Sequence, residues 1–387
     1  MHLFRLKSSE QQLKRMLGLM SVSSLLFFSS CTQPMAGIRG TLTGVESDTL
    51  LVFMDYMHSR QHFRTDTVAL HDNNFNITLP DTALYINILA KPALPNGALR
   101  MAVGRPILYF PGDHLKVVGE WDNKKVLGSA LYNELAEHQS ILALQEEINS
   151  LNEAFTLAYQ SQDKSKQNDI RQKVAARYNE IQQAKFDIIK HNPNTVSAAY
   201  YATEMKPELG LDAISLLSEE VKSGPMSILI KDAKVRYENS LARAKAKKYI
   251  KKGNMAPNFN LKTLEGKDVS LATFHGKYLL LDFWGSWCGW CIKGFPEMKK
   301  YYAKYSKKIE FLGVCCNDTD VKWRKAVETH KLPWVNAIEG DAKLSVKYAV
   351  SGFPTKILIN PEGQIEKVFV GESPELYHYL EIGRAHV

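Results

Sequence analysis

The 387-residue sequence is poor in cysteine, nearly balanced in charge and without a long hydrophobic run. Five cysteines are too few for a disulfide scaffold of this length. No stretch of about 18 consecutive apolar residues occurs, so no full transmembrane helix is expected. Lysine and arginine number 49 against 41 acidic residues, and a net charge of +8 on so long a chain gives no reason to expect nucleic acid as a partner.

The composition that remains is that of ordinary globular protein, with 45% hydrophobic and 23% charged residues. This composition excludes wholesale disorder and a collagen-like repeat. At roughly 100–200 residues per domain, the length allows two or three domains. We therefore expect a multidomain protein.

The first 30 residues have the pattern of a secretory signal. Basic residues precede an apolar stretch at 16–28, and two small serines then lead to Cys31. A cysteine in that place resembles the lipoprotein signal of bacteria, in which the cysteine is lipidated and becomes the mature N-terminus. We therefore expect residues 1–30 to be removed and Cys31 to hold a lipid anchor at the periplasmic face of a bacterial membrane. A signal cleaved elsewhere, with Cys31 incidental, is the alternative.

Residues 31–128 are expected to form an N-terminal antiparallel β-sandwich. Residues 75–79 alternate between apolar and polar, which is the period of a half-buried strand. Short strands at close spacing are typical of a small sandwich. Three further strands are expected at 50–53, 84–89 and 115–118.

Residues 129–252 are expected to form a central helical segment. Apolar residues recur every three or four positions at 141–155 and at 170–181. This spacing predicts two amphipathic helices, paired antiparallel with a loop near 161–165. Because the spacing is also heptad-like, dimerisation is an alternative to packing within the chain. No motif in the first two regions indicates a ligand or a metal.

Residues 253–380 alternate strand and helix, which predicts an α/β domain with a mixed sheet covered by helices. Residues 381–387 do not continue the last helical pattern; back-translated, they resemble read-through of a sequencing adapter. The expected strands span 278–283, 309–316, 355–359 and 364–370. The expected helices span 289–305, 321–330, 341–348 and 374–380.

The strongest chemical signal is the pair Cys288 and Cys291, where a strand gives way to a helix. Two cysteines at i and i+3 lie within disulfide reach. Cys288 faces the unsatisfied N–H groups and the positive end of the helix, which favour a thiolate over a thiol. We expect Cys288 to be the nucleophile and Cys291, one turn further in, to resolve the mixed disulfide. The pair is a redox-active disulfide, and no other cofactor and no metal is expected.

Residues 281–291, which read LDFWGSWCGWC, resemble the active-site segment of thioredoxin-fold proteins. With the segment APNF at 256–259, they resemble the TlpA/ResA-like membrane-anchored thiol–disulfide oxidoreductases, over roughly residues 253–380. The segment GFPT at 352–355 matches the cis-proline loop of that family, which packs against the cysteine pair. The resemblance implies a thioredoxin-like fold for this region. The β and helical regions resemble N-terminal extensions carried by many such lipoproteins.

The resemblance also implies roles for other residues. The backbone beside Pro354 would pair with an extended substrate segment, and Pro354 would keep metal away from the thiols. Asp282 would be buried beneath the active site and assist deprotonation of Cys291, with its pKa raised by burial; the alternative is a strand residue that faces a polar pocket. The other residues expected on the substrate-binding surface are Trp287, Gly289, Trp290 and Phe353.

Two positions depart from the family pattern. A Gly-Trp dipeptide stands between the cysteines in place of Gly-Pro, so the motif does not assign the redox direction. Gly294 stands where ResA-like members often carry a glutamate, so the pH response is expected to differ. Cys315 and Cys316 are adjacent on an expected strand, so their side chains should point to opposite faces as buried free thiols.

These observations predict a thiol–disulfide oxidoreductase of the cell envelope that acts on protein thiols and disulfides in the reducing direction. Anchored relatives often serve cytochrome c maturation or thiol maintenance, which implies a membrane thiol donor of electrons. Three alternatives remain. They are a thiolate chaperone for copper or zinc, a peroxidase of the peroxiredoxin type and a surface protein whose N-terminal regions bind a ligand.

Overall fold

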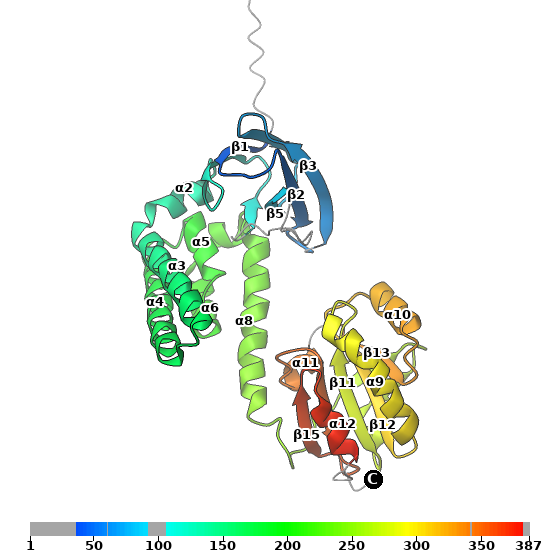
Figure 1. Ribbon diagram of the computed structural model, residues 1–387. Coiled ribbons are helices and arrows are strands. Elements are labelled where there is room, and N and C mark those ends of the chain that lie inside the picture. Colours follow the sequence, from blue (N-terminus) through cyan, green and yellow to red (C-terminus); the bar gives the residue numbers. More distant parts are fainter. Residues whose placement is uncertain (1–35, 60, 92–105, 341–342, 382–387) are drawn as a thin grey trace, which may run out of the picture. The chain divides into compact units, whose positions relative to one another are not determined.

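A computed structural model describes residues 36–59, 61–91, 106–340 and 343–381 (Figure 1). The expected signal segment, Cys31 and residues 382–387 lie outside the described residues. The chain divides into two compact units, Met1–Asn133 and Glu134–Val387. Within the described ranges, we find no helix whose length and hydrophobicity would suffice to span a membrane.

The described residues of the first unit form two four-stranded sheets, with the strand orders β4-β1-β7-β8 and β3-β2-β5-β6. Alternate strand residues from both sheets, such as Ile38, Val52 and Val117, share one hydrophobic core. This arrangement is a sandwich, as expected. The strands are β1 (Gly37–Thr43), β2 (Thr49–Tyr56), β3 (His62–Ala69), β4 (Asn74–Thr78), β5 (Leu84–Lys91), β6 (Ile107–Tyr109), β7 (His114–Glu120) and β8 (Asn123–Leu127).

The sandwich is not wholly antiparallel, which corrects the expectation from the sequence. β1 and β7 pair in parallel, with Ile38 opposite Leu115. Parallel neighbours need a long connection, and here β2 to β6 lie between them in the chain. The alternation of apolar and polar residues gives the period of a strand but not the direction of its partner, so the sequence pattern could not reveal this pair.

The second unit begins with helices. α3 (Gln139–Gln160) and α4 (Lys164–His191) pack against each other, as expected, and Asp163 caps α4 by accepting a hydrogen bond from the Lys166 N–H. Of the expected apolar stripe, Ile148 is buried, whereas Tyr178 is exposed. α2 (Ala130–Glu137) crosses the boundary between the two units, and α5 (Val196–Ala202), α6 (Pro207–Leu216), α7 (Glu219–Ser223) and α8 (Ser227–Lys247) follow α4.

The rest of the second unit is the expected α/β domain. Its seven-stranded mixed sheet has the order β10-β9-β13-β12-β11-β14-β15. The central strand β11 (Tyr278–Trp284) runs parallel to β12 (Ile309–Cys315) and antiparallel to β14 (Thr355–Ile359), which pairs with β15 (Ile365–Val370). Three short strands were not expected, because three or four residues are too few to show a period. They are β9 (Asn260–Thr263), β10 (Asp268–Ser270) and β13 (Val335–Ile338).

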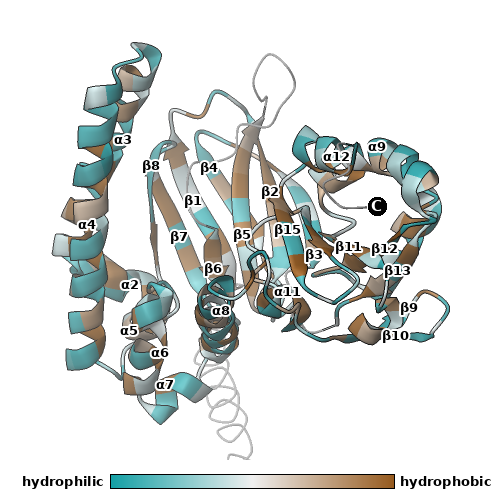
Figure 2. Ribbon diagram, turned by 90° about the horizontal axis from the view of Figure 1, so that it is seen from below, coloured by the Kyte–Doolittle hydropathy of each residue, from teal (hydrophilic) through white to brown (hydrophobic). Residues whose placement is uncertain are grey.

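Helices cover both faces of this sheet. α9 (Gly289–Tyr305), α10 (Asp320–Thr329) and α12 (Pro374–Glu381) share a core with Leu280 and Trp284. α11 (Lys343–Lys347) shares the core of the opposite face with Leu279 and Leu281. Because both faces are covered, β11 is apolar along most of its length, and Figure 2 shows the sheets richer in hydrophobic residues than α3 and α4. α12 continues to Glu381, one residue past its expected end.

Candidate active site

The two cysteines lie where the chain passes from β11 into α9. Cys288 is the N-cap of α9, and a disulfide joins it to Cys291 in the first turn. The Cys291 N–H donates a hydrogen bond to Cys288 Sγ at 3.1 Å. Cys288 is 6% exposed and Cys291 2%, so Cys288 is the more accessible of the two. On reduction, the N–H groups of the first turn would stabilise a thiolate on Cys288, and its role as the nucleophile stays a prediction.

The loop before Cys288 is held by the segment that follows β12. The Asp318 carboxylate accepts a hydrogen bond from the Ser286 N–H at 2.8 Å, and Trp287 Nε1 donates to the Cys316 carbonyl at 3.1 Å. A Cβ at Gly285 would overlap the Trp287 ring, so only glycine leaves room for this contact. The contact of Asp318 with the loop before Cys288 was not predicted, because nothing in the local sequence connects residue 318 to residue 286.

Exposed aromatic side chains flank the disulfide. The Trp287 ring is 51% exposed and meets the Phe353 ring edge-on, with 5.1 Å between the centroids. The peptide between Phe353 and Pro354 is cis, as the resemblance implied. Trp290 is 66% exposed, and Gly289 begins α9 with open space at its Cβ position. The role of these residues in binding substrate stays a prediction.

Asp282 is buried in the middle of the sheet, between β12 and β14. Burial raises the pKa of this carboxyl to about 6, the charge of Lys356 opposes the shift and that of Glu372 adds to it. Among the described residues, its Oδ1 atom accepts no hydrogen bond. A carboxyl group with such a pKa is suited to accept a proton near neutral pH. The direction of the pKa shift agrees with the expectation, and the role as a base stays a prediction.

Two charged residues next to Asp282 were not predicted. Lys356 lies opposite Asp282 in the register of β14, and its Nζ is 3.8 Å from Asp282 Oδ1 and 2.8 Å from Glu372 Oε2. The hydroxyl of Tyr377 donates to Glu372 Oε1 at 2.8 Å. A lysine next to the apolar residues 357–359 of the same strand was a usable signal, since a buried cation needs an anionic partner. Glu372 gave no such signal, because its position depends on the path of the loop after β15.

The carboxylate of Glu372 lies against Gly294 of α9. A Cβ at residue 294 would overlap this carboxylate, so the glycine leaves the space that Glu372 fills. The sequence itself has a glycine and no acid at residue 294. The structure places an acid there from another element, the loop between β15 and α12.

Comparison with known proteins assigns the family. Residues 251–381 match the Redoxin family model. Over 132 residues the chain is 34% identical to thiol-disulfide oxidoreductase ResA of Bacillus cereus, a match that covers 33% of this chain and 76% of the relative. The chain belongs to the ResA-like thiol-disulfide oxidoreductases. It is therefore an oxidoreductase with a thioredoxin-like fold in its C-terminal region, and it exchanges thiols and disulfides.

Two further similarities accompany this match. ResA of Bacillus subtilis (strain 168) is 32% identical over 139 residues, which cover 35% of this chain and 78% of the relative. The thioredoxin domain of a thiol-disulfide oxidoreductase from Bacteroides vulgatus is 32% identical, with a TM-score of 0.33 and coverage of 34% of this chain and 96% of that domain. The ResA relatives thus match about a third of this chain.

The other two described cysteines of this ResA-like oxidoreductase are buried on opposite faces of the sheet, as expected. The Cys315 thiol donates to Asp318 Oδ2 at 3.4 Å, and the Cys316 thiol donates to Glu339 Oε2 at 3.2 Å. Burial, and then the neighbouring carboxylates, raise the pKa of both thiols. Both stay protonated at neutral pH, so neither is a nucleophile there.

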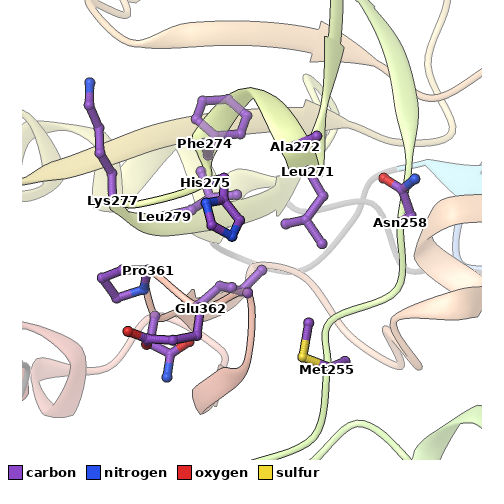
Figure 3. Close-up of a pocket in the computed structure, with 13 residues that line it drawn as sticks. Met255, Asn258, Leu271, Ala272, Phe274, His275, Lys277, Leu279, Pro361 and Glu362 are labelled. Atoms are coloured by element: carbon purple, nitrogen blue, oxygen red, sulfur yellow. The ribbon is translucent and has the colours of Figure 1, made fainter.

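A pocket of about 240 Å³ lies at the other end of β11 from the disulfide (Figure 3). Leu279, near the start of β11, lines it, whereas the cysteines follow the end of that strand. Figure 3 shows Pro361 and Glu362 on one side and His275 and Leu271 on the other. Neither redox cysteine contributes to the pocket, so it is not part of the active site of the ResA-like domain.

Proposed function

We propose that this ResA-like oxidoreductase is a lipid-anchored reductase of protein disulfides in the bacterial cell envelope. The observation that carries the exchange chemistry is the Cys288–Cys291 disulfide at the N-terminus of α9, with Asp282 buried in the strand before it. The envelope location and the anchor are supported by the sequence of residues 1–31, which has a basic segment, an apolar segment and small residues before Cys31.

The reaction begins on the reduced enzyme. The Cys288 thiolate attacks one sulfur of a substrate disulfide, a mixed disulfide forms and the other substrate sulfur leaves as a thiolate. Cys291 then attacks the Cys288 sulfur while Asp282 takes the proton of Cys291. The second substrate thiolate leaves and takes a proton from water. Two electrons have moved to the substrate, and Cys288 and Cys291 are joined again.

The substrate segment is proposed to lie against the loop at Pro354. Proline has no backbone N–H, and the Pro354 carbonyl already accepts a hydrogen bond from the Gly371 N–H at 2.8 Å. We therefore propose that the backbone of Phe353 pairs with an extended substrate chain. The exposed rings of Trp287 and Trp290 would contact the side chains of that segment.

The reducing direction requires a source of electrons. We infer a membrane thiol donor that returns the Cys288–Cys291 disulfide to the dithiol after each turnover. A protein anchored in the envelope with such a donor would serve cytochrome c maturation or the maintenance of protein thiols.

Reduction of insulin by dithiothreitol tests the catalytic part of this proposal. We expect the purified protein to accelerate the precipitation of insulin chains and Cys288→Ser to abolish the acceleration. Cys315→Ser, which removes a buried thiol outside the pair, is the control and should remain active. Equal rates for the wild type and Cys288→Ser would rule out the exchange at this pair.

Trapping of substrates and lipid labelling test the other parts. Cys291→Ser should accumulate mixed disulfides with envelope proteins on Cys288, and the double serine variant should accumulate none. Labelled palmitate should enter the full chain and be absent from Cys31→Ser, which should also leave the membrane fraction. Equal labelling of the two proteins would argue against the anchor.

A further inference from the structure

The exposed tryptophans of the protein lie beside the redox cysteines. Of the six tryptophans, four are buried, and the two exposed ones are Trp287 and Trp290. The Trp287 ring is held by the Phe353 ring and by a hydrogen bond to the Cys316 carbonyl. Trp290, which stands between the two cysteines in the sequence, is the more exposed of the pair. A large exposed indole is typical of a side chain that anchors a binding partner.

A cation lies against this exposed ring. Lys293 follows Trp290 by three residues in α9, so the two side chains share one face of the helix. Lys293 Nζ is 4.7 Å from the centroid of the Trp290 ring, which is the distance of a cation–π contact. Lys293 is itself exposed. The ring and the ammonium therefore form one surface, apolar on the indole and positive at Nζ, in the first turns of the helix that Cys288 caps.

The charge of Lys293 is not compensated by an acid of the protein. Lys293 lines an open groove of about 470 Å³ together with three glutamates, but each of these pairs with another lysine. The pairs are Glu297 with Lys300, Glu372 with Lys356 and Glu381 with Lys304, at N–O distances of 2.7, 2.8 and 3.8 Å. Within the described part of the chain, no ion pair includes Lys293. The positive end of α9 adds to the potential of this ammonium.

We propose that Trp290 and Lys293 form a specificity-determining site that selects substrate segments with an acidic residue and an apolar side chain next to the reacting cysteine. This inference rests on the proposed exchange with protein substrates and names a chemical feature of those substrates. The apolar side chain covers the Trp290 ring, and the acidic side chain pairs with the Lys293 ammonium. Both contacts form before Cys288 attacks, so they act on the second-order rate of that attack.

Short peptides joined to nitrothiobenzoate through a disulfide measure this selectivity. The Cys288 thiolate of the reduced full-length protein attacks the peptide sulfur, the enzyme–peptide disulfide forms and the nitrothiobenzoate anion leaves, because it is the better leaving group. Absorbance follows its release. Three peptides differ only in the residue after the cysteine, which is aspartate, asparagine or lysine. Each rate is divided by the rate of the same peptide with mercaptoethanol, which removes the effect of the flanking charge on the disulfide itself.

The charge of Lys293 is tested by the ratio of the rates of the aspartate and lysine peptides. At low ionic strength we expect this ratio to be about fivefold higher in the wild type than in Lys293→Gln, the size expected when one exposed attraction and one exposed repulsion are lost. Lys293→Glu should lower the ratio further, and about 0.5 M salt should reduce the difference between the proteins. Lys300→Gln is the matched control, because it removes the same charge from the same helix at a residue that pairs with Glu297. Its ratio should equal that of the wild type.

The ring of Trp290 is tested by a second pair of peptides, which carry leucine or alanine before the cysteine and aspartate after it. We expect the wild type to prefer the leucine peptide about threefold more strongly than Trp290→Ala does, since the leucine loses its apolar contact in the variant. Trp290→Phe keeps an aromatic ring and should retain most of the preference. Equal leucine-to-alanine ratios in the wild type and Trp290→Ala would overturn the role of the ring.

The outcomes separate recognition from the exchange reaction. Because each ratio compares two peptides on one protein, a general loss of folding or of Cys288 reactivity in a variant cancels. Nitrothiobenzoate release by the wild type with the same aspartate-to-lysine ratio in Lys293→Gln and Lys293→Glu would overturn the recognition site and leave exchange intact. A fall of equal size in Lys300→Gln would assign the selectivity to net charge and also overturn it. Release by the wild type no faster than by Cys288→Ser would reject the proposed exchange itself.

Discussion

The burial of Asp282 affects both the pKa of its carboxyl group and the stability of the folded protein. The folded protein raises the pKa of its carboxyl from the ordinary 3.8 to about 6, chiefly by burial. Between these values the folded state binds more protons than the unfolded state, so stability falls as the pH rises through this window. Above it, the ionised carboxylate costs the fold about 3 kcal/mol, at about 1.4 kcal/mol per pKa unit. The carboxyl that we propose as the base is thus retained at a cost in stability.

The substitution Asp282→Asn should remove this cost. We expect the free energy of unfolding of the oxidised variant to exceed that of the wild type by about 2–3 kcal/mol at about pH 8. The difference should shrink to about 0.5 kcal/mol or less near pH 4, where the wild-type carboxyl is protonated in the fold. Urea denaturation at the two pH values measures it. A difference that is the same at both would show that ionisation of Asp282 is not its source.

The cysteines should differ sharply in reactivity. Iodoacetamide added to the reduced native protein at neutral pH should modify Cys288 first, because its sulfur caps the helix and is the most accessible of the four described. Cys315 and Cys316 should react only after denaturation, because they are buried and protonated. Mass spectrometry of peptides measures the order. Fast labelling of Cys316 in the folded protein would contradict the assignment.

At the scale of elements, the active site depends on contacts between segments far apart in the chain. The loop before Cys288 obtains its hydrogen-bond acceptor from Asp318, after β12, and its aromatic neighbour from Phe353, before β14. Because β11 pairs with both β12 and β14, the three segments meet where β11 and β12 end and β14 begins. The geometry of the site therefore depends on the pairing of these three strands.

Asp318→Ala tests this coupling between elements. Loss of the acceptor leaves the Ser286 N–H unpaired, and we expect a decrease of about 1–2 kcal/mol in the free energy of unfolding. The rate of insulin reduction should fall as well, because the loop that positions Cys288 is loosened. Asp320→Ala is the control: its exposed ion pair with Arg324 should contribute about 0.5 kcal/mol or less. Equal effects of the two substitutions would argue against a special role for Asp318.

The elements with strong local signals could be predicted from the sequence. α9 spans Gly289–Tyr305 and β14 spans Thr355–Ile359, both as expected, since a cysteine cap and the turn at 360–363 mark their ends. The cysteine pair could also be predicted, because Cys288 and Cys291 are only three residues apart in the sequence. The contact of Lys356 with Glu372 and the parallel pairing of β1 with β7 could not be found in this way, because they depend on which strands become neighbours.

At the scale of the whole molecule, the described active-site residues come from one continuous region. The cysteines, Asp282, Asp318 and Glu372 all lie within residues 251–381, the segment that matches the Redoxin family. The preceding sandwich and helices contribute none of them. The named active-site residues and the N-terminal regions thus occupy separate parts of the chain.

A fragment of residues 251–381 should therefore fold and reduce insulin. We expect its kcat/KM to agree with that of the longer chain within about twofold, since a domain with its own core folds independently. The same fragment with Cys288→Ser supplies the background rate. A fragment that is folded by circular dichroism yet inactive would show that the N-terminal regions take part in the reaction.

The segment at residues 253–256 decides where such a fragment should begin. Both backbone groups of Ile365 are bonded outside the sheet, its N–H to the Asn254 carbonyl and its carbonyl to the Gly253 N–H, each at 2.8 Å. The Ala256 N–H also bonds to the Gly363 carbonyl at 2.9 Å. β15 is a border strand, and an uncovered border recruits other chains. Residues 253–256 thus cover the first residue of this border strand, and we expect a fragment that begins at residue 257 to elute as soluble oligomers or to precipitate during purification.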